Sequence, residues 1–326
     1  MNVVFAGAPD LAVPTLRATA SSAHRVSLVV TQPDRLAGRG RRAHATAVKR
    51  AAEALGLRVL QPRSINDPEA VEALCAAAPD VVLVAAYGKR LLRRALRAPR
   101  IGCYNVHFSL LPRHRGAAPI NYALLAGDAE TGITVQRMAS RIDAGPIVAQ
   151  FPLAIREDDT AGALAERLGA LSGSVIVSVL DAIETGRAQE RKQDETLATE
   201  APALEKRDGL IPWTRSAEEL ARFVRGMTPW PGAFTFREPF GGSAQRRVIV
   251  LAAETVETLS ESARHADGPV AKPGMVILAD RELLVKTGSG ALRLLRVQPE
   301  SARAMSAEDY LRGYAVHVGD RFREPR

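Results

Sequence analysis

The sequence predicts an α/β protein with a doubly wound, mostly parallel sheet, followed by a small all-β domain. Strand-like and helix-like segments alternate through the first half, residues 80–86 are apolar throughout, and short alternating segments separated by turn residues fill the last third. Alternation is typical of a sheet covered by helices on both faces, and a continuous apolar run is typical of a buried parallel strand. With 326 residues and 46% hydrophobic content, the chain is long enough for two domains.

The first half opens with a short apolar strand over residues 2–6, followed by a helix that Asp10 can cap and that runs to about Ser21. Further strands are predicted at 25–31, 58–61, 80–86, 101–107, 131–138 and 146–152, and further helices at 45–55, 67–77 and 160–185. The last helix carries apolar residues at helical spacing, so it should pack on the sheet.

A polar stretch poor in large apolar groups follows this helix, and we interpret it as a linker over residues 187–206. Beyond it, a short helix is predicted at 217–226 and short strands near 247–252, 273–278, 282–287 and 292–298. Many short strands with turn residues between them indicate a small β-barrel.

The amino-terminal sequence lacks a basic region before a long apolar core, and no window approaches the roughly 18 uninterrupted apolar residues of a membrane span. We therefore expect a cytoplasmic protein without a membrane partner. The two cysteines, Cys75 and Cys103, are too few for a disulfide framework and lack metal-ligand spacing, so no metal is expected. A nucleophilic role for Cys103 is weighed, but a small buried apolar residue is the favoured interpretation.

Nucleotide-binding motifs are missing where this fold class would carry them. The turn after the first strand has no G-x-G-x-x-G, the glycines at 38 and 40 do not lie between a strand and a helix, and the P-loop pattern is absent. The sequence therefore argues against a dinucleotide enzyme.

The formal charge of +8 favours an anionic partner. One basic cluster lies between residues 35 and 50 and contains Arg35, Arg39, Arg41, Arg42, Lys49 and Arg50. Either it is a solvated loop or, as we favour, it faces nucleic-acid phosphates, since its glycines keep the backbone adaptable. A second cluster between residues 89 and 100 fits the solvated face of a helix.

Asn105, His107 and Asp143 form the most informative group of polar residues. Side chains alternate along a strand, so Asn105 and His107 project from the same face of the strand 101–107. An amide, an imidazole and a carboxylate can stabilise a tetrahedral oxyanion and move protons during acyl transfer. Each residue alone also has a structural interpretation: His107 as a histidine of the core, Asn105 as a turn former, and Asp143 before Ala-Gly as part of an ordinary hairpin turn.

Several short motifs accompany this group. In chain order they are Phe5-Ala-Gly-Ala-Pro-Asp10, Thr31-Gln-Pro-Asp-Arg35, Ala37-Gly-Arg-Gly40, Ala85-Ala-Tyr-Gly88, Asn105-Val-His107, Ser109-Leu-Leu-Pro112, Arg115-Gly-Ala-Ala-Pro-Ile120, Ala126-Gly-Asp-Ala-Glu-Thr-Gly132, Ile142-Asp-Ala-Gly145 and Pro229-Trp-Pro-Gly232. In this order and spacing they resemble the formyltransferase family, and within it the members that act on methionyl initiator tRNA. The resemblance spans nearly the whole chain.

This resemblance implies transfer of the formyl group of 10-formyltetrahydrofolate to the amino group of methionine on initiator tRNA, by a monomer that uses no metal. It implies a Rossmann-like catalytic domain over 1–186, the linker over 187–206, and an OB-like tRNA-binding barrel over 207–326. Asn105, His107 and Asp143 would be catalytic. Folate would lie against two segments, one formed by Ser109, Leu110, Leu111 and Pro112 and the other by Gly88, Lys89, Arg90 and Leu91. The acceptor stem would lie against Arg39, Arg41 and Arg42.

Three positions depart from the family pattern: Phe108 replaces a small residue, the segment 139–142 lacks the expected acidic and glycine residues, and Pro212 replaces an acidic residue. Three alternatives stay open: an amino-sugar-nucleotide formyltransferase, a catalytically inactive tRNA-binding protein, and a folate-dependent formyl hydrolase. The basic loop favours tRNA over a sugar nucleotide, and the intact Asn105, His107 and Asp143 argue against an inactive protein.

Overall fold

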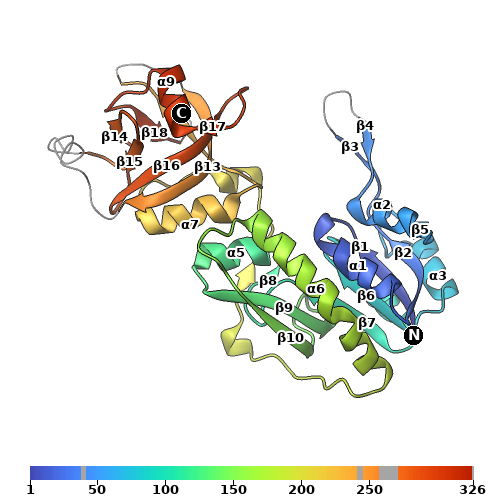
Figure 1. Cartoon of the computed structure of the whole chain (residues 1–326). Coiled ribbons are helices and arrows are strands. Elements are labelled where there is room, and N and C mark those ends of the chain that lie inside the picture. The colour runs from blue at the N-terminus through green and yellow to red at the C-terminus, as the bar shows by residue number, and fades with distance from the viewer. Residues whose placement is uncertain (38–41, 241–244, 257–270, 325–326) are drawn as a thin grey trace. The chain divides into compact units, whose positions relative to one another are not determined.

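The computed structural model describes residues 1–37, 42–240, 245–256 and 271–324. The chain divides into two compact units, and we describe each by itself (Figure 1). The first unit comprises residues 1–120, 129–155 and 163–203, and the second comprises 121–128, 156–162 and 204–326. Most of the polar stretch predicted as a linker therefore belongs to the first unit.

A seven-stranded sheet forms the centre of the first unit, in the order β10-β9-β7-β6-β1-β2-β5. Its strands are β1 (Asn2–Gly7), β2 (Arg25–Val30), β5 (Val59–Leu60), β6 (Val81–Ala85), β7 (Gly102–His107), β9 (Glu130–Arg137) and β10 (Ile147–Ala154). The five strands from β7 to β5 run parallel, whereas β9 and β10 are antiparallel to their neighbours. The predicted Rossmann-like, mostly parallel sheet is confirmed.

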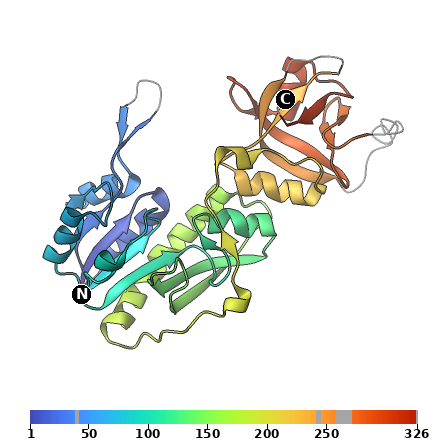
Figure 2. The ribbon, with the colours of Figure 1, turned by 180° about the vertical axis from the view of Figure 1, so that it is seen from behind.

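Helices cover both faces of this sheet. They are α1 (Val13–Ala20), α2 (Ala47–Ala54), α3 (Pro68–Ala76), α4 (Arg93–Leu96), α5 (Pro119–Ala126), which passes into the second unit, and α6 (Ala161–Glu184). Leu74 of α3 and Ala95 of α4 share a buried cluster with Val82 of β6, on the face that Figure 2 brings forward. The prediction that Asp10 caps α1 was wrong: a 3₁₀ turn over Asp10–Ala12 precedes the helix and has no side-chain cap.

The helix α6 is long and apolar enough to cross a membrane by length and composition, a test that core helices of soluble proteins also pass. Its residues Leu164, Leu168 and Leu180 are fully buried. A methyl group added to Gly173 would lie 3.1 Å from Pro14, which shows how closely α6 approaches the start of α1. This packing is that of a core helix, as predicted.

Two short strand pairings complete the first unit. The strands β3 (Arg35–Ala37) and β4 (Arg42–His44) pair with each other, where the sequence predicted only a loop. The strands β8 (Arg115–Gly116) and β11 (Glu200–Ala201) pair in parallel and bring the polar stretch after α6 back to the loop that follows β7.

The second unit is a nearly closed antiparallel barrel, as predicted. Its strands are β12 (Ala233–Glu238), β13 (Arg246–Val256), β14 (Val276–Ala279), β15 (Leu283–Lys286), β16 (Ala291–Pro299), β17 (Met305–Ser306) and β18 (Arg321–Arg323), and its helices are α7 (Ala217–Met227) and α9 (Ala307–Tyr314). The strand order β14-β15-β16-β13-β12-β18 is closed by a bridge between Met275 and Arg321. Ser216 begins α7 with a capping box, in which its hydroxyl accepts from the N–H of Glu219.

Candidate functional site

The parallel strands β1, β6 and β7 end at the same end of the sheet, so the loops that follow them lie together. In doubly wound folds this end usually carries the ligand site. Asn105 and His107 lie at the carboxyl end of β7, and the antiparallel strand β9 places Gln136 directly opposite Asn105. The loop after β9 then places Asp143 beside Asn105 and His107.

Four groups contact the carboxylate of Asp143. Its Oδ1 accepts hydrogen bonds from Nδ2 of Asn105 at 3.3 Å and from Nε2 of Gln136 at 2.9 Å. Its Oδ2 accepts from the backbone N–H of Gly116 at 3.0 Å and lies 3.6 Å from Nδ1 of His107. The structure therefore brings the three predicted catalytic residues together and leaves the carboxylate 12% exposed.

His107 is 5% exposed, and its ring orientation follows from one hydrogen bond. Nε2 lies 2.8 Å from the backbone carbonyl of His114. A carbonyl oxygen only accepts, so Nε2 is the protonated nitrogen, and Nδ1 is directed toward Asp143. A neutral ring therefore presents a lone pair at Nδ1, and a protonated ring forms an ion pair with the carboxylate.

The loop Ser109, Leu110, Leu111 and Pro112 leaves the end of β7 and is held by polar side chains of the neighbouring strands. Thr134 donates to the carbonyl of Ser109 at 2.7 Å and accepts from the N–H of Leu111 at 3.0 Å. Gln150 donates to the carbonyl of Leu111 at 2.8 Å. Ser109 and Leu111 are buried, while Leu110 and Pro112 are half-buried.

The second predicted folate segment follows β6, the parallel neighbour of β7. Gly88, Lys89 and Arg90 are exposed and Leu91 is buried. Gly88 has a φ of +73°, the left-handed conformation that favours glycine. Because β6 and β7 end side by side, this segment lies at the same end of the sheet as Asn105.

Of the three arginines predicted to contact tRNA, Arg39 and Arg41 lie outside the described residues. Arg42 is the first residue of β4. The described backbone before residue 38 and after residue 41 forms the strand pair β3 and β4, which Figure 1 shows extending from the first unit.

Cys103 is 3% exposed and lies in the core cluster with Ala95 and Val82. Burial raises the pKa of its thiol to about 12, because a thiolate loses its hydration there. The favoured interpretation of Cys103 as a small buried residue is therefore supported, and its burial and raised pKa argue against a nucleophilic role.

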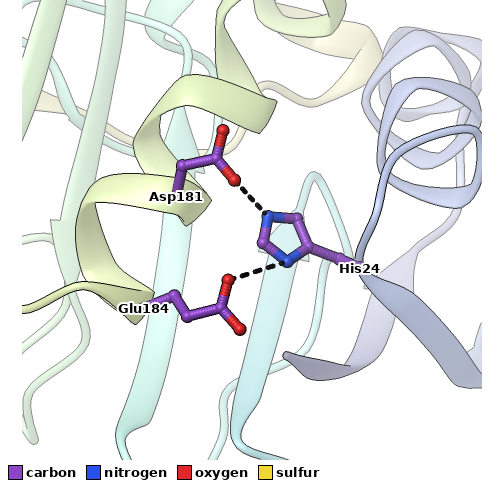
Figure 3. A group of neighbouring side chains, drawn as sticks. All are labelled: His24, Asp181 and Glu184. Atoms are coloured by element: carbon purple, nitrogen blue, oxygen red, sulfur yellow. Dashed lines mark ion pairs between the residues drawn. The ribbon is translucent and has the colours of Figure 1, made fainter.

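His24, Asp181 and Glu184 gather at the opposite end of the sheet, just before β2 (Figure 3). Nε2 of His24 lies 3.1 Å from Asp181, and Nδ1 lies 3.8 Å from Glu184. The amino group of Met1 donates to Glu184 at 2.8 Å and lies 3.2 Å from Nδ1 of His24. Because an ammonium already supplies the positive charge in this group, the arrangement fits an ion-pair cluster that ties α6 to β1 and β2.

The structure adds residues that the sequence did not single out. Gln136 reaches Asp143 from β9, and Gln193 reaches the backbone of the Asp143 loop from the stretch predicted as a linker. Arg115 is 2% exposed and forms a bidentate ion pair with Glu195, at 2.9 and 3.0 Å. This hydrogen bond holds the pKa of the Glu195 carboxyl below its ordinary value. Gln193 and Glu195 lie in a polar stretch without apolar periodicity, so nothing in the sequence indicated that they lie near the Asp143 loop.

An amide donor and an imidazole that both lie close to one carboxylate, at 3.3 and 3.6 Å, can stabilise an oxyanion and move a proton. Nδ2 of Asn105 carries two hydrogens, and one of them forms the hydrogen bond to Asp143. The other makes no hydrogen bond within the described part of the chain, so it can meet an oxygen of a bound substrate.

Comparison with known proteins agrees with this arrangement. Residues 1–180 match the Formyl transferase family and residues 203–315 match the Formyl transferase C-terminal domain. The methionyl-tRNA formyltransferase of Methylococcus capsulatus is 43% identical over 316 residues, which cover 97% of this chain and 98% of that protein. The methionyl-tRNA formyltransferase of Methylobacillus flagellatus is 41% identical, with 99% of both chains covered.

Solved structures show the same fold at low identity. HypX from Aquifex aeolicus in complex with tetrahydrofolic acid has a TM-score of 0.60 at 16% identity, and the match covers 99% of this chain and 48% of HypX. An N-formyltransferase from Helicobacter canadensis, in complex with folinic acid and dTDP-3-aminofucose, has a TM-score of 0.62 at 13% identity, covering 91% and 98%. The two family matches together span most of the sequence. The chain belongs to the formyltransferase family.

Proposed function

We infer that this enzyme transfers a formyl group to the free amino group of methionyl initiator tRNA, which supplies formylmethionyl-tRNA for translation initiation. The observation that carries this conclusion is the near full-length match, at 43% identity, to a methionyl-tRNA formyltransferase. The family uses a formyl-tetrahydrofolate donor, and we propose the 10-formyl form.

In the proposed reaction the substrate amine attacks the formyl carbon, forming a C–N bond and a tetrahedral carbon with a negatively charged oxygen. The amine nitrogen loses a proton, the bond between the carbon and N10 of the folate breaks, and N10 takes up a proton. The products are the formamide and tetrahydrofolate. The enzyme must stabilise the oxyanion and relay the proton.

We assign oxyanion stabilisation to the second Nδ2 proton of Asn105. Asp143 is the proposed acceptor of the proton from the attacking amine, directly or through water. His107, whose ring faces the carboxylate, is proposed to assist it. Nε2 of His107 is engaged by the carbonyl of His114, so a second hydrogen bond to the oxyanion would come from Nδ1 of the protonated ring. That nitrogen lies 3.6 Å from the carboxylate of Asp143.

The proposed folate contacts are the two segments at the ends of β6 and β7. Both lie at the same end of the sheet as Asn105, and hydrogen bonds from Thr134 and Gln150 keep the segment after β7 in place. The proposed tRNA contacts are Arg39, Arg41 and Arg42, whose charge suits a phosphate backbone.

Incubation of the purified protein with 10-formyltetrahydrofolate and methionyl initiator tRNA tests this proposal. We expect formylated methionyl-tRNA, and loss of this product in His107→Ala. A dTDP-amino sugar as acceptor and an assay for released formate serve as parallel reactions. Formylation of the sugar alone, or formate release alone, would overturn the tRNA assignment.

A further inference from the structure

We propose that Gln193 is a positioning residue that fixes the backbone of the Asp143 loop, and that Arg115 and Glu195 hold Gln193 in place. This inference depends on the proposed role of Asp143 in formyl transfer. It assigns a part in the reaction to the stretch after α6, which carries none of the predicted catalytic residues.

Gln193 uses both ends of its side-chain amide. Its Nε2 donates to the backbone carbonyl of Asp143 at 2.8 Å and to that of Gly145 at 2.7 Å. Its Oε1 accepts from Nη2 and Nε of Arg115 at 2.7 and 3.1 Å. The side chain of Gln193 therefore connects the catalytic loop to a buried guanidinium.

The loop that Gln193 holds has an unfavourable backbone conformation at Asp143. Asp143 has a φ of +47°, which is unfavourable for a residue with a Cβ. Such a conformation persists only where surrounding contacts maintain it, and a methyl group on Gly145 would collide with the carbonyl of Arg137 at 1.8 Å. Hydrogen bonds to the carbonyls on both sides of Ala144 maintain the turn that aims the carboxylate at Asn105 and His107.

Arg115 and Glu195 set the position of Gln193 in turn. The guanidinium of Arg115 is buried, and Glu195 neutralises it with a bidentate ion pair. Arg141, two residues before Asp143, contacts the same carboxylate at 3.0 Å. The pairing of β8 with β11 adds backbone hydrogen bonds, including one from Arg115 to the carbonyl of Thr199 at 2.8 Å.

A primary amide suits this place, since it donates to the two backbone carbonyls and also accepts from Arg115. Gln193→Glu keeps the size of the side chain and the acceptor for Arg115. It removes the donor and directs a negative charge at two carbonyl oxygens. The variant thus separates the contact to the catalytic loop from the contact to Arg115.

The experiment measures formyl transfer by wild-type and Gln193→Glu enzyme under steady-state and single-turnover conditions. We expect kcat to fall about 10- to 100-fold, with little change in KM for either substrate and an unchanged affinity for folate. Gln298→Glu is the matched control: its half-buried amide also donates to a backbone carbonyl, that of Ala302 at 3.1 Å, but in the second unit. We expect the control to retain wild-type kcat.

A double-mutant cycle distinguishes positioning from general damage. If Gln193 acts through Asp143, Gln193→Glu will cause no further decrease of the single-turnover rate in an Asp143→Asn background. Equal decreases in both backgrounds, or a wild-type kcat in the single variant, would overturn the inference. If Gln193→Glu lowers the unfolding temperature, Gln193→Met, which adds no charge, replaces it in the cycle. A wild-type enzyme that does not formylate tRNA would instead refute the proposed function.

Discussion

The backbone N–H of Gly116 donates to Oδ2 of Asp143 at 3.0 Å, so the loop after β7 directly holds the carboxylate that follows β9. Gly116 has a φ of +126° and lies in β8, paired with Ala201 of β11. A methyl group there would lie 2.4 Å from the carbonyl of Ala201. One glycine therefore joins the strand pairing to the proposed catalytic group.

We expect Gly116→Ala to destabilise the protein by about 1–3 kcal/mol, because the added methyl must displace the backbone of β11 and the φ is unfavourable. The kcat should fall as well, since the N–H moves away from Asp143. Far-UV circular dichroism during urea unfolding measures the first effect. Gly186→Ala is the matched control, because Gly186 also has a positive φ of 70° but open space around it. Equal effects of both substitutions would refute the role of the close approach.

Asn105→Ala should lower kcat by about 10²–10³, the usual cost of removing one oxyanion donor. The KM for both substrates should change little, since the proposed interaction forms in the transition state. Initial-rate kinetics with saturating folate test this. A variant that raises KM while keeping kcat would show that Asn105 binds the ground state instead.

The predicted tRNA contacts can be tested by charge. Replacing Arg39, Arg41 and Arg42 together with alanine should raise the KM for tRNA and lower the slope of log affinity against log salt by about one unit for each phosphate that is no longer neutralised. The triple substitution of Arg93, Arg94 and Arg97, which lie at or beside α4, is the matched control because it removes the same charge. An equal decrease of affinity in both variants would indicate a long-range effect of net charge rather than a local interaction.

The two thiols should react very differently with an alkylating reagent at pH 8. Burial raises the pKa of Cys103 to about 12, so its thiolate fraction at this pH is on the order of 10⁻⁴, while Cys75 is exposed. Mass spectrometry should find one label per native chain, on Cys75, and two after denaturation. Rapid labelling of Cys103 in the folded protein would contradict the buried position, and Cys103→Ser should retain formyl transfer.

Local patterns in the sequence were sufficient to predict the parallel sheet, the long helix and the barrel, because apolar periodicity reports which face of an element is buried. They could not predict pairing between distant segments. The register that places Gln136 opposite Asn105 and the two-residue pairing of β8 with β11 depend on tertiary contacts. The basic segment around β3 and β4 has no apolar alternation, so its strands were not predicted.

Because local patterns do not report contacts between distant segments, only part of the site could be predicted. Asn105 and His107 could be placed together because strand alternation requires it. Gln193 lies 50 residues beyond Asp143 in a polar stretch, and composition alone made that stretch look like a linker. Its contacts arise from hydrogen bonding, which leaves no periodic trace in the sequence.

Closure of the barrel by Met275 and Arg321 has a consequence for behaviour at high concentration. An unpaired edge strand offers hydrogen-bonding groups to other chains and promotes aggregation. The bridge removes that hazard at the meeting of β14 and β18. In the other sheet, the outer strand β10 contains Pro152, which lacks a donor, and its first residue Ile147 exchanges both backbone hydrogen bonds with Arg191. The barrel and the β10 edge of the first sheet are thus protected against edge-to-edge association with other chains.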